Sequence, residues 1–259
     1  MLNIATKFRA EMDQAIALVA LIGATRNLAQ TQTSGQQWRS PAGKILRNLH
    51  RLSIDFTSTH LAYDGIYLVI CAHFELTVRQ LIEQFVEELM ASLTSFHHLP
   101  SAIKDWHPTG CAQIMMKMNQ ESFGHLTPDA LIANLASCLN ASAAKPYKLT
   151  TEAYSFNEHN FRPSILEEQI SKRLGLSKVW QKLSRQPSLT TFFKATRSET
   201  VENLSRKRLE DCMLRRNQII HRGRTYYTAG ETEVIDCAKF LCAFTESLAN
   251  VLVKYRDSL

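Results

Sequence analysis

An arginine, an asparagine and a histidine lie close together in the run Leu214-Arg-Arg-Asn-Gln-Ile-Ile-His-Arg-Gly223. A guanidinium such as that of Arg216 stays charged and can bind a phosphate through two donors, and histidine, here His221, is the residue type most often used for proton transfer. On a helix, Asn217 and His221 are four residues apart and share a face. These residue types suit proton transfer at a phosphate, and the run contains no set of metal ligands.

The position of Arg216 on its helix raises the question of a partner. It follows Leu209 by seven residues and Met213 by three, which places it on the apolar stripe. A half-buried guanidinium is costly unless a carboxylate, a phosphate or another chain satisfies its donors. No partner is evident within one chain, so we predict a homodimer in which the two Arg216–Gly223 segments face each other.

Two further polar residues are candidates for supporting roles. Glu75 lies beside the apolar stripe of an earlier helix and could reach Arg216; the alternative is an ordinary pair with Arg79, four residues later. Asn217 could orient His221 or a phosphate oxygen; the alternative is a local hydrogen bond near a helix end. We predict Glu75 and Asn217 as supporting residues.

Positive charge is concentrated around the same run. Residues 206–224 hold seven cations and two carboxylates, a net +5 of the +6 of the whole chain. Such a patch attracts a phosphate backbone through counterion release. Basic residues also offset the helix dipole in a last turn, and Gly223 is a common helix stop, so local stability is the alternative explanation. The predicted RNA-binding residues are Arg215, Arg222, Arg224, Arg208 and Lys207.

Helical spacing of apolar residues runs through almost the whole chain. The strongest helices are predicted over Tyr63–Met90, Glu199–His221 and Val234–Tyr255, and no stretch alternates convincingly with period two. Residues 30–37 are typical of a loop. We therefore predict one all-α domain over residues 1–259. The further predicted helices are Ala5–Leu28, Pro41–Thr57, Ala102–Met118, Pro128–Leu139 and Pro163–Leu174, the last preceded by Asn160 and followed by Gly175.

Composition excludes several classes of protein. The 259 residues are 45% hydrophobic and 21% charged, with only 9 Gly and 7 Pro, which argues against disordered and collagen-like chains. The six cysteines form no C-x-x-C pair and predict reduced core thiols. The longest apolar run, Ala15–Ala24, is too short for a membrane span. We expect a cytoplasmic protein without a metal, a cofactor or a membrane, and we assign no site to the other histidines, among them His107 and His125.

The arrangement Arg216-Asn217-x-x-x-His221-x-Gly223 at a helix end, before a short loop and a final amphipathic helix, resembles the R-x4-6-H signature of the HEPN superfamily (higher eukaryotes and prokaryotes nucleotide-binding domains). The run Ala72–Arg79, the Asn160-x-x-Pro163 start and Leu174-Gly-Leu176 are similar to its RiboL-PSP and related bacterial branches. The resemblance covers roughly residues 61–256. It implies a HEPN-type bundle with additional middle helices, preceded by an N-terminal helical extension over residues 1–60.

The resemblance further implies a metal-independent endoribonuclease with its active site across a dimer. The RNA 2′-OH would attack the neighbouring phosphate and leave a cyclic phosphate and a 5′-OH, with His221 as general acid or base and Arg216 stabilising the phosphoryl charge. The expected biological role is a toxin or phage-defence effector that cuts tRNA or other single-stranded RNA, with an antitoxin or defence-system protein as partner. The alternatives are a non-catalytic helical module that binds nucleic acid or protein, and the regulatory half of a toxin–antitoxin pair.

Overall fold

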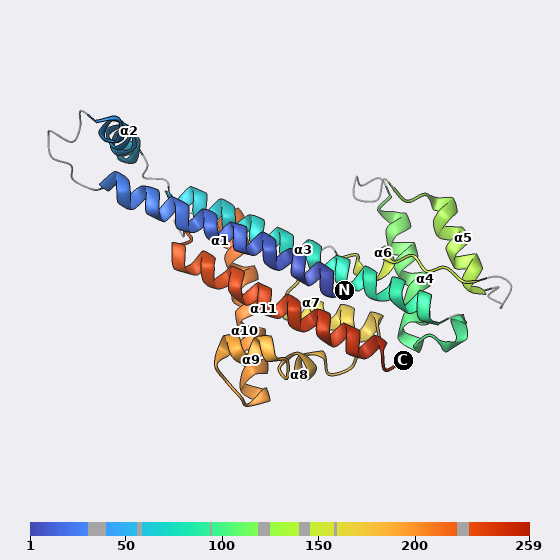
Figure 1. Ribbon diagram of the computed structural model, residues 1–259. Coiled ribbons are helices and arrows are strands. Elements are labelled where there is room, and N and C mark those ends of the chain that lie inside the picture. Colours follow the sequence, from blue (N-terminus) through green and yellow to red (C-terminus); the bar gives the residue numbers. More distant parts are fainter. Residues whose placement is uncertain are drawn as a thin grey trace.

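The computed structural model describes residues 1–30, 40–55, 59–93, 95–118, 125–139, 146–157, 160–221 and 228–259. These residues form helices and contain no strand, which confirms the predicted all-α class (Figure 1). Every predicted helix is present, with ends that differ by a few residues. The elements are α1 (Leu2–Gln30), α2 (Pro41–Asp55), α3 (Thr59–Ser92), η2 (Phe96–His98), α4 (Ser101–Met116), α5 (Pro128–Leu139), α6 (Glu152–Ser155), α7 (Pro163–Glu167), η4 (Glu168–Arg173), α8 (Val179–Leu183), α9 (Pro187–Phe193), α10 (Ser198–Ile220) and α11 (Glu231–Arg256).

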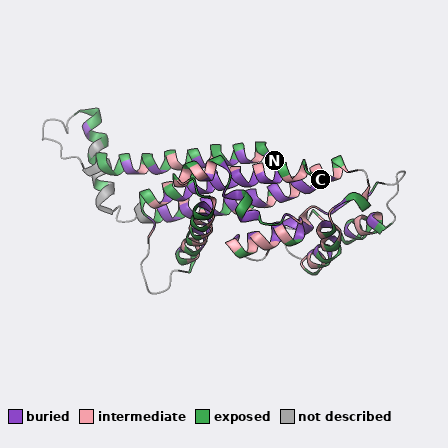
Figure 2. Cartoon of the chain, turned by 90° about the horizontal axis from the view of Figure 1, so that it is seen from below, coloured by how far each residue is buried: buried purple, intermediate pink, exposed green. Residues whose placement is uncertain are grey.

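Three long helices, α1, α3 and α11, lie side by side and form the body of the molecule (Figure 1). The helices α8, α9 and α10 pack beneath them, and α4 to α6 gather at the far end of α3. Buried residues line the surfaces where the long helices meet (Figure 2). On α3 the buried stripe consists of Ile70, Phe74, Val78, Leu81, Phe85 and Leu89, and Ile66, which continues the same spacing, is only partly buried.

The apolar character of α3 follows from its central position. Among the described helices, α3 over Leu61–Ser92 alone is long and apolar enough to cross a membrane. The run Ala15–Ala24 is thus not the stretch that comes closest to a membrane span. The six residues of the α3 stripe are fully buried by neighbouring helices, and 44% of the apolar window of α3 is buried.

The N-terminal helix belongs to the same core as the rest of the bundle. Phe8, Met12 and Val19 of α1 are buried against α3 and α11, and the ring of Phe8 lies 6.5 Å from that of Phe74. Packing of α1 therefore stabilises α3 and α11. In the sequence, the helix that carries the Arg216–His221 motif, α10, lies between these two helices. In contrast, α2 packs against α1.

The middle segment is more irregular than its sequence pattern indicates. The predicted helix Pro163–Leu174 consists of α7 followed by η4, which is a π-helix over Glu168–Arg173. Gly175 then adopts a φ of +81°, which suits glycine at a helix end, and the Leu176 amide donates to the Ile170 carbonyl at 3.2 Å.

The prediction for the cysteines is confirmed, whereas most of the predicted loop over residues 30–37 lies outside the described residues. All six cysteines are free and buried, as predicted. Of the predicted loop over residues 30–37, residue 30 ends α1, and residues 31–37 lie outside the described part of the chain.

Candidate active site

The C-terminal end of α10 carries the candidate catalytic residues. Leu209 and Met213 bury one face of this helix, and Arg216 continues the same face at a point where 24% of its side chain is exposed. His221 is the C-cap residue; its amide donates to the Asn217 carbonyl at 2.9 Å, and its side chain is exposed. Arg222, Gly223 and Arg224 lie outside the described residues, so the predicted stop at Gly223 is not described either.

Arg216 has partners within its own chain. Its Nη1 donates to Asn160 Oδ1 at 2.8 Å and to Asn217 Oδ1 at 3.2 Å, and its Nη2 lies 3.8 Å from Glu75 Oε2. The premise that one chain leaves Arg216 without a partner is therefore wrong, and a homodimer no longer follows from it. Of the two alternatives for Glu75, the structure has the contact with Arg216; Arg79 instead donates to the Asn157 carbonyl at 3.2 Å.

Asn160 is a site residue that sequence reasoning missed. Its Oδ1 accepts from Arg216, and its Nδ2 donates to Asn217 Oδ1 at 2.6 Å, so one amide connects both residues. The pattern before Pro163 suggested a helix-cap role, but the N-cap of α7 is Arg162, and no side chain caps that helix. Asn160 and Arg216 are 56 residues apart in the sequence, and no local spacing links them.

Glu75 provides a carboxylate in a mostly buried position. Burial raises the pKa of Glu75, and Arg216, Arg79 and the backbone of Phe161 partly offset this effect. At 3.8 Å, Arg216 Nη2 is beyond hydrogen-bond distance of Glu75 Oε2. Two neutral amides and one carboxylate thus orient Arg216, and the described residues pair only part of its five donors.

Arg215, one of the predicted RNA-binding residues, is paired within its own chain. Only 11% of its side chain is exposed; its Nε lies 2.7 Å from Glu233 Oε1, and its Nη2 donates to the Thr228 carbonyl at 2.8 Å. Arg215 therefore ties α10 to the start of α11. The Ala229 amide, just before α11, donates to Asp64 of α3 at 2.6 Å, which fixes the start of α11 against α3.

Carboxylates also neutralise part of the positive charge at residues 206–208. Arg206 pairs with Glu167 at 2.9 Å and with Glu202 at 3.3 Å, and its guanidinium lies 4.8 Å from the Trp180 ring centroid. Lys207 is exposed and Arg208 is partly buried. Among the described residues of the predicted set, Lys207 is therefore the exposed cation that remains a candidate for RNA binding.

The described residues include no group of three or more His, Cys, Asp and Glu side chains placed to hold a metal ion. The chemistry available at the end of α10 is that of a charged guanidinium, two amides, a half-buried carboxylate and an exposed imidazole. This combination can bind a phosphoryl group and move a proton.

An all-α bundle whose penultimate long helix ends in Arg216-Asn217-x-x-x-His221 has the features of a HEPN domain. The model of the RiboL-PSP-HEPN family matches residues 44–254, most of the chain, and the protein therefore belongs to this family. The match includes α3, α10 and α11, and it begins within α2. No curated protein and no solved structure matches the chain significantly.

Proposed function

We propose that the protein is a metal-independent endoribonuclease. The observation that carries the proposal is the orientation of Arg216 by Asn160, Asn217 and Glu75 next to an exposed His221. A guanidinium that only stabilised the fold would need no titrating group on the adjacent helical turn. Family membership supports the same class of activity, because HEPN domains are generally associated with ribonucleases.

The proposed reaction uses the RNA 2′-OH as the nucleophile. The 2′ oxygen forms a bond to phosphorus while the bond to the 5′ oxygen breaks, which leaves a 2′,3′-cyclic phosphate and a 5′-OH. The 2′-OH loses a proton and the 5′ oxygen gains one; His221 serves as the acid or base for one of these transfers. Arg216 binds the non-bridging oxygens, on which negative charge builds up.

We retain the homodimer as part of the proposal, on new grounds. Leu214 and His221 are seven residues apart and share one face of α10, and 41% of Leu214 is exposed. An exposed leucine beside the motif suits an apolar contact between two copies of the chain. A second copy would also supply the acid or base for the other proton transfer.

The biological setting that we propose is a cytoplasmic toxin or defence effector, with tRNA or single-stranded RNA as substrate and an antitoxin or defence-system protein as partner. Of the alternatives, a non-catalytic binding module would bind RNA and leave it intact. The same experiment on purified protein distinguishes this module from the nuclease.

In the decisive experiment, the purified protein is incubated with total cellular RNA in EDTA, and the chemical groups at the ends of the RNA fragments are determined. We expect fragments with 2′,3′-cyclic phosphates and 5′-OH groups. His221→Ala should abolish cleavage, whereas His125→Ala, a change of another exposed histidine, should leave it intact. Cleavage by folded His221→Ala protein, or a strict need for a divalent ion, would contradict the proposal.

A matched pair of substitutions on α10 tests the dimer. Leu214→Glu should shift the protein toward monomer in light scattering and reduce cleavage. Leu204→Glu changes a leucine of similar exposure, 38%, ten residues earlier, and should change neither. An active protein that stays monomeric at the assay concentration would contradict the dimer but leave the nuclease proposal standing.

A further inference from the structure

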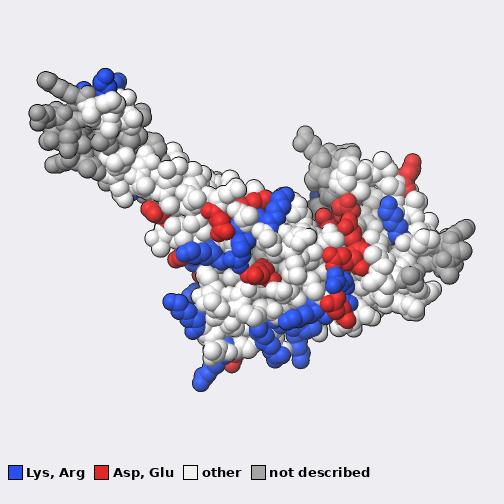
Figure 3. Space-filling model, viewed as in Figure 1, with Lys and Arg blue, Asp and Glu red and all other residues white. Residues whose placement is uncertain are grey.

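A hollow of about 330 Å³ lies between α8 and the C-terminal end of α11. Three cations line it, Lys182 and Arg185 from α8 and the turn after it, and Lys254 from α11, and no carboxylate does. Figure 3 shows Lys and Arg side chains gathered along the lower edge of the molecule, where α8 and α9 lie. The other residues that line the hollow are Gln186, Val251, Tyr255 and Ser258.

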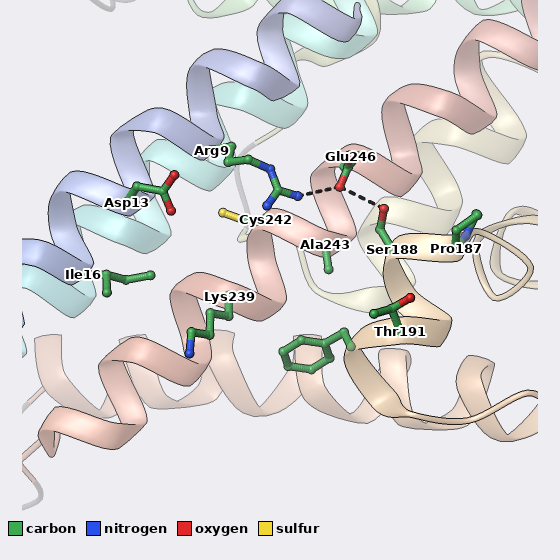
Figure 4. A pocket seen from close by; sticks show the side chains of 11 residues that line it. Arg9, Asp13, Ile16, Pro187, Ser188, Thr191, Lys239, Cys242, Ala243 and Glu246 are labelled. Carbon is green, nitrogen blue, oxygen red and sulfur yellow. Dashed lines mark hydrogen bonds and ion pairs between the residues drawn. The ribbon is translucent and has the colours of Figure 1, made fainter.

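A second hollow, of about 430 Å³ between α1, α9 and α11, provides the contrast (Figure 4). Two cations, Arg9 and Lys239, and two carboxylates, Asp13 and Glu246, line it. Arg9 lies 2.6 Å from Glu246, which also accepts from Ser188 at 2.8 Å. The charges of this hollow cancel within the protein, so it has no excess charge with which to attract an ion.

The cations of the α8–α11 hollow are not compensated in this way. Within the described part of the chain, no ion pair with a carboxylate is formed by Lys182, Arg185 or Lys254. Asp257, near the end of α11, pairs with Arg256 at 2.6 Å and does not line the hollow. Like charges that converge on one hollow repel one another, and a bound anion removes this cost.

The walls of the hollow are held in place by other contacts. The Tyr255 ring stacks on Phe85 at 5.6 Å, and its hydroxyl donates to the Leu174 carbonyl at 3.0 Å. Gln186 is buried, and its Nε2 donates to the Lys182 carbonyl at 3.1 Å, which fixes the end of α8. Lys182 Nζ lies 5.7 Å from the Tyr255 ring centroid. The cations therefore project from a rigid frame, which lowers the entropic cost of binding an anion.

The hollow does not overlap the candidate active site. Arg216 contacts Glu75 of α3, and Tyr255, which lines the hollow, stacks on Phe85 ten residues further along α3, which corresponds to about 15 Å along that helix. A single nucleotide bound at Arg216 does not reach it. An RNA of several nucleotides, or a folded RNA, does.

From these observations we infer that Lys182, Arg185 and Lys254 form a second phosphate-binding site, which holds the backbone of an RNA at a place separate from Arg216. The identity of the ligand as RNA rests on the proposed function, whereas the anion site itself does not. The site would select substrates by size and would contribute affinity that is largely indifferent to sequence.

The test measures RNA binding as a function of salt in a His221→Ala background, in which the RNA stays intact. The variant carries Lys182→Gln, Arg185→Gln and Lys254→Gln together. For a long structured RNA, we expect the slope of log affinity against log salt to fall by about two to three units, since each of the three phosphate contacts contributes about 0.7–0.9. A dinucleotide should bind both proteins equally. The matched control replaces three exposed lysines elsewhere, Lys7, Lys44 and Lys148, by Gln and should keep the original slope.

The second part of the test adds a nucleoside triphosphate and measures the rise in the melting temperature of the protein. A rise in the parent protein that is lost in the triple variant, with an unchanged RNA slope, would show a phosphate site that takes free nucleotide and would overturn RNA as its ligand. No change in either part of the test would overturn the site itself. A salt slope that falls as expected, when the protein with His221 intact cleaves no RNA, would support the site and refute the nuclease.

Discussion

Two regions of the molecule each contain an arginine and a histidine: Arg216 and His221 at the end of α10, and Arg173 and His107 in the middle segment. Arg173 is 7% exposed; its Nη1 donates to the carbonyls of Phe156 at 2.5 Å and Tyr154 at 3.3 Å, and its guanidinium lies 4.5 Å from the Trp106 ring centroid. Burial lowers the pKa of Arg173 to about 10. His107 is buried against the Tyr154 ring.

The kind of partner distinguishes the two pairs. Arg173 and His107 both form hydrogen bonds to backbone groups, and both side chains are closed off from solvent. Arg216 is oriented by side chains, keeps donors free and lies beside a histidine that solvent reaches. The same two residue types thus hold the fold together in one region and remain open to a ligand in the other.

The largest expected effect separates the two arginines by activity. Arg216→Ala should lower RNA cleavage by about 10²–10³-fold, the usual loss when one donor to a developing oxyanion is removed. Its thermal unfolding should remain close to that of the parent, because Arg216 is partly exposed and its partners can bind water. Single-turnover cleavage assays together with melting curves provide the measurement.

Arg173→Met is the counterpart and should show the opposite result. It leaves the carbonyls of buried Tyr154 and partly buried Phe156 without their charged donor, so we expect a loss of about 3 kcal/mol in the free energy of unfolding. Cleavage per folded molecule should stay near the parent value. If Arg173→Met lost activity without losing stability, the distinction between the two regions would be incorrect.

His107 makes the middle segment sensitive to acid. Its Nε2 accepts from the Thr150 amide at 2.9 Å, so the ring is neutral, and burial lowers its pKa from 6.5 to about 4. The unfolded chain takes up the proton first as the pH falls. Stability should therefore be lost between pH 6.5 and 4, by about 3 kcal/mol in total. Urea unfolding at several pH values measures this, and His107→Gln should flatten the pH dependence, whereas His125→Gln should not.

Asn160→Ala should produce an intermediate effect at the active site. Arg216 would keep Asn217 and Glu75 but lose its shortest contact, and we expect cleavage to fall about tenfold through poorer positioning. Asn160→Asp retains the acceptor for Arg216 and should recover part of the loss. Equal activity of Asn160→Ala and parent protein would show that Asn160 does not position Arg216.

The smallest expected effect concerns Lys207. Lys207→Ala should lower the salt slope of RNA binding by about one unit, as for a single phosphate contact. Arg206→Ala should change this slope less, because Glu167 and Glu202 already pair with Arg206. Filter binding at a series of salt concentrations measures both, and a larger change for Arg206→Ala would reverse the assignment.

Local patterns in the sequence predict the helices well, because apolar spacing, Gly175 and the motif are all local signals. The motif spacing likewise identifies Arg216 and His221 as candidates. In contrast, the contact of Asn160 with Arg216 depends on how distant segments pack, and no spacing within either segment encodes it. The ion pair between Arg215 and Glu233 is missed for the same reason, and it changes a predicted RNA contact into a link between two helices.

The π-helical turn at Glu168–Arg173 has a consequence for how this segment can change during evolution. An i→i+5 turn encloses one residue more than an α-helical turn, so it corresponds to a one-residue insertion in a regular helix. Deleting one residue there would rewind the segment and rotate Arg173 by about 100° relative to α7, away from Trp106 and its two carbonyl groups. The number of residues in this segment is therefore more constrained than their identity, and insertions or deletions here should be rarer than substitutions.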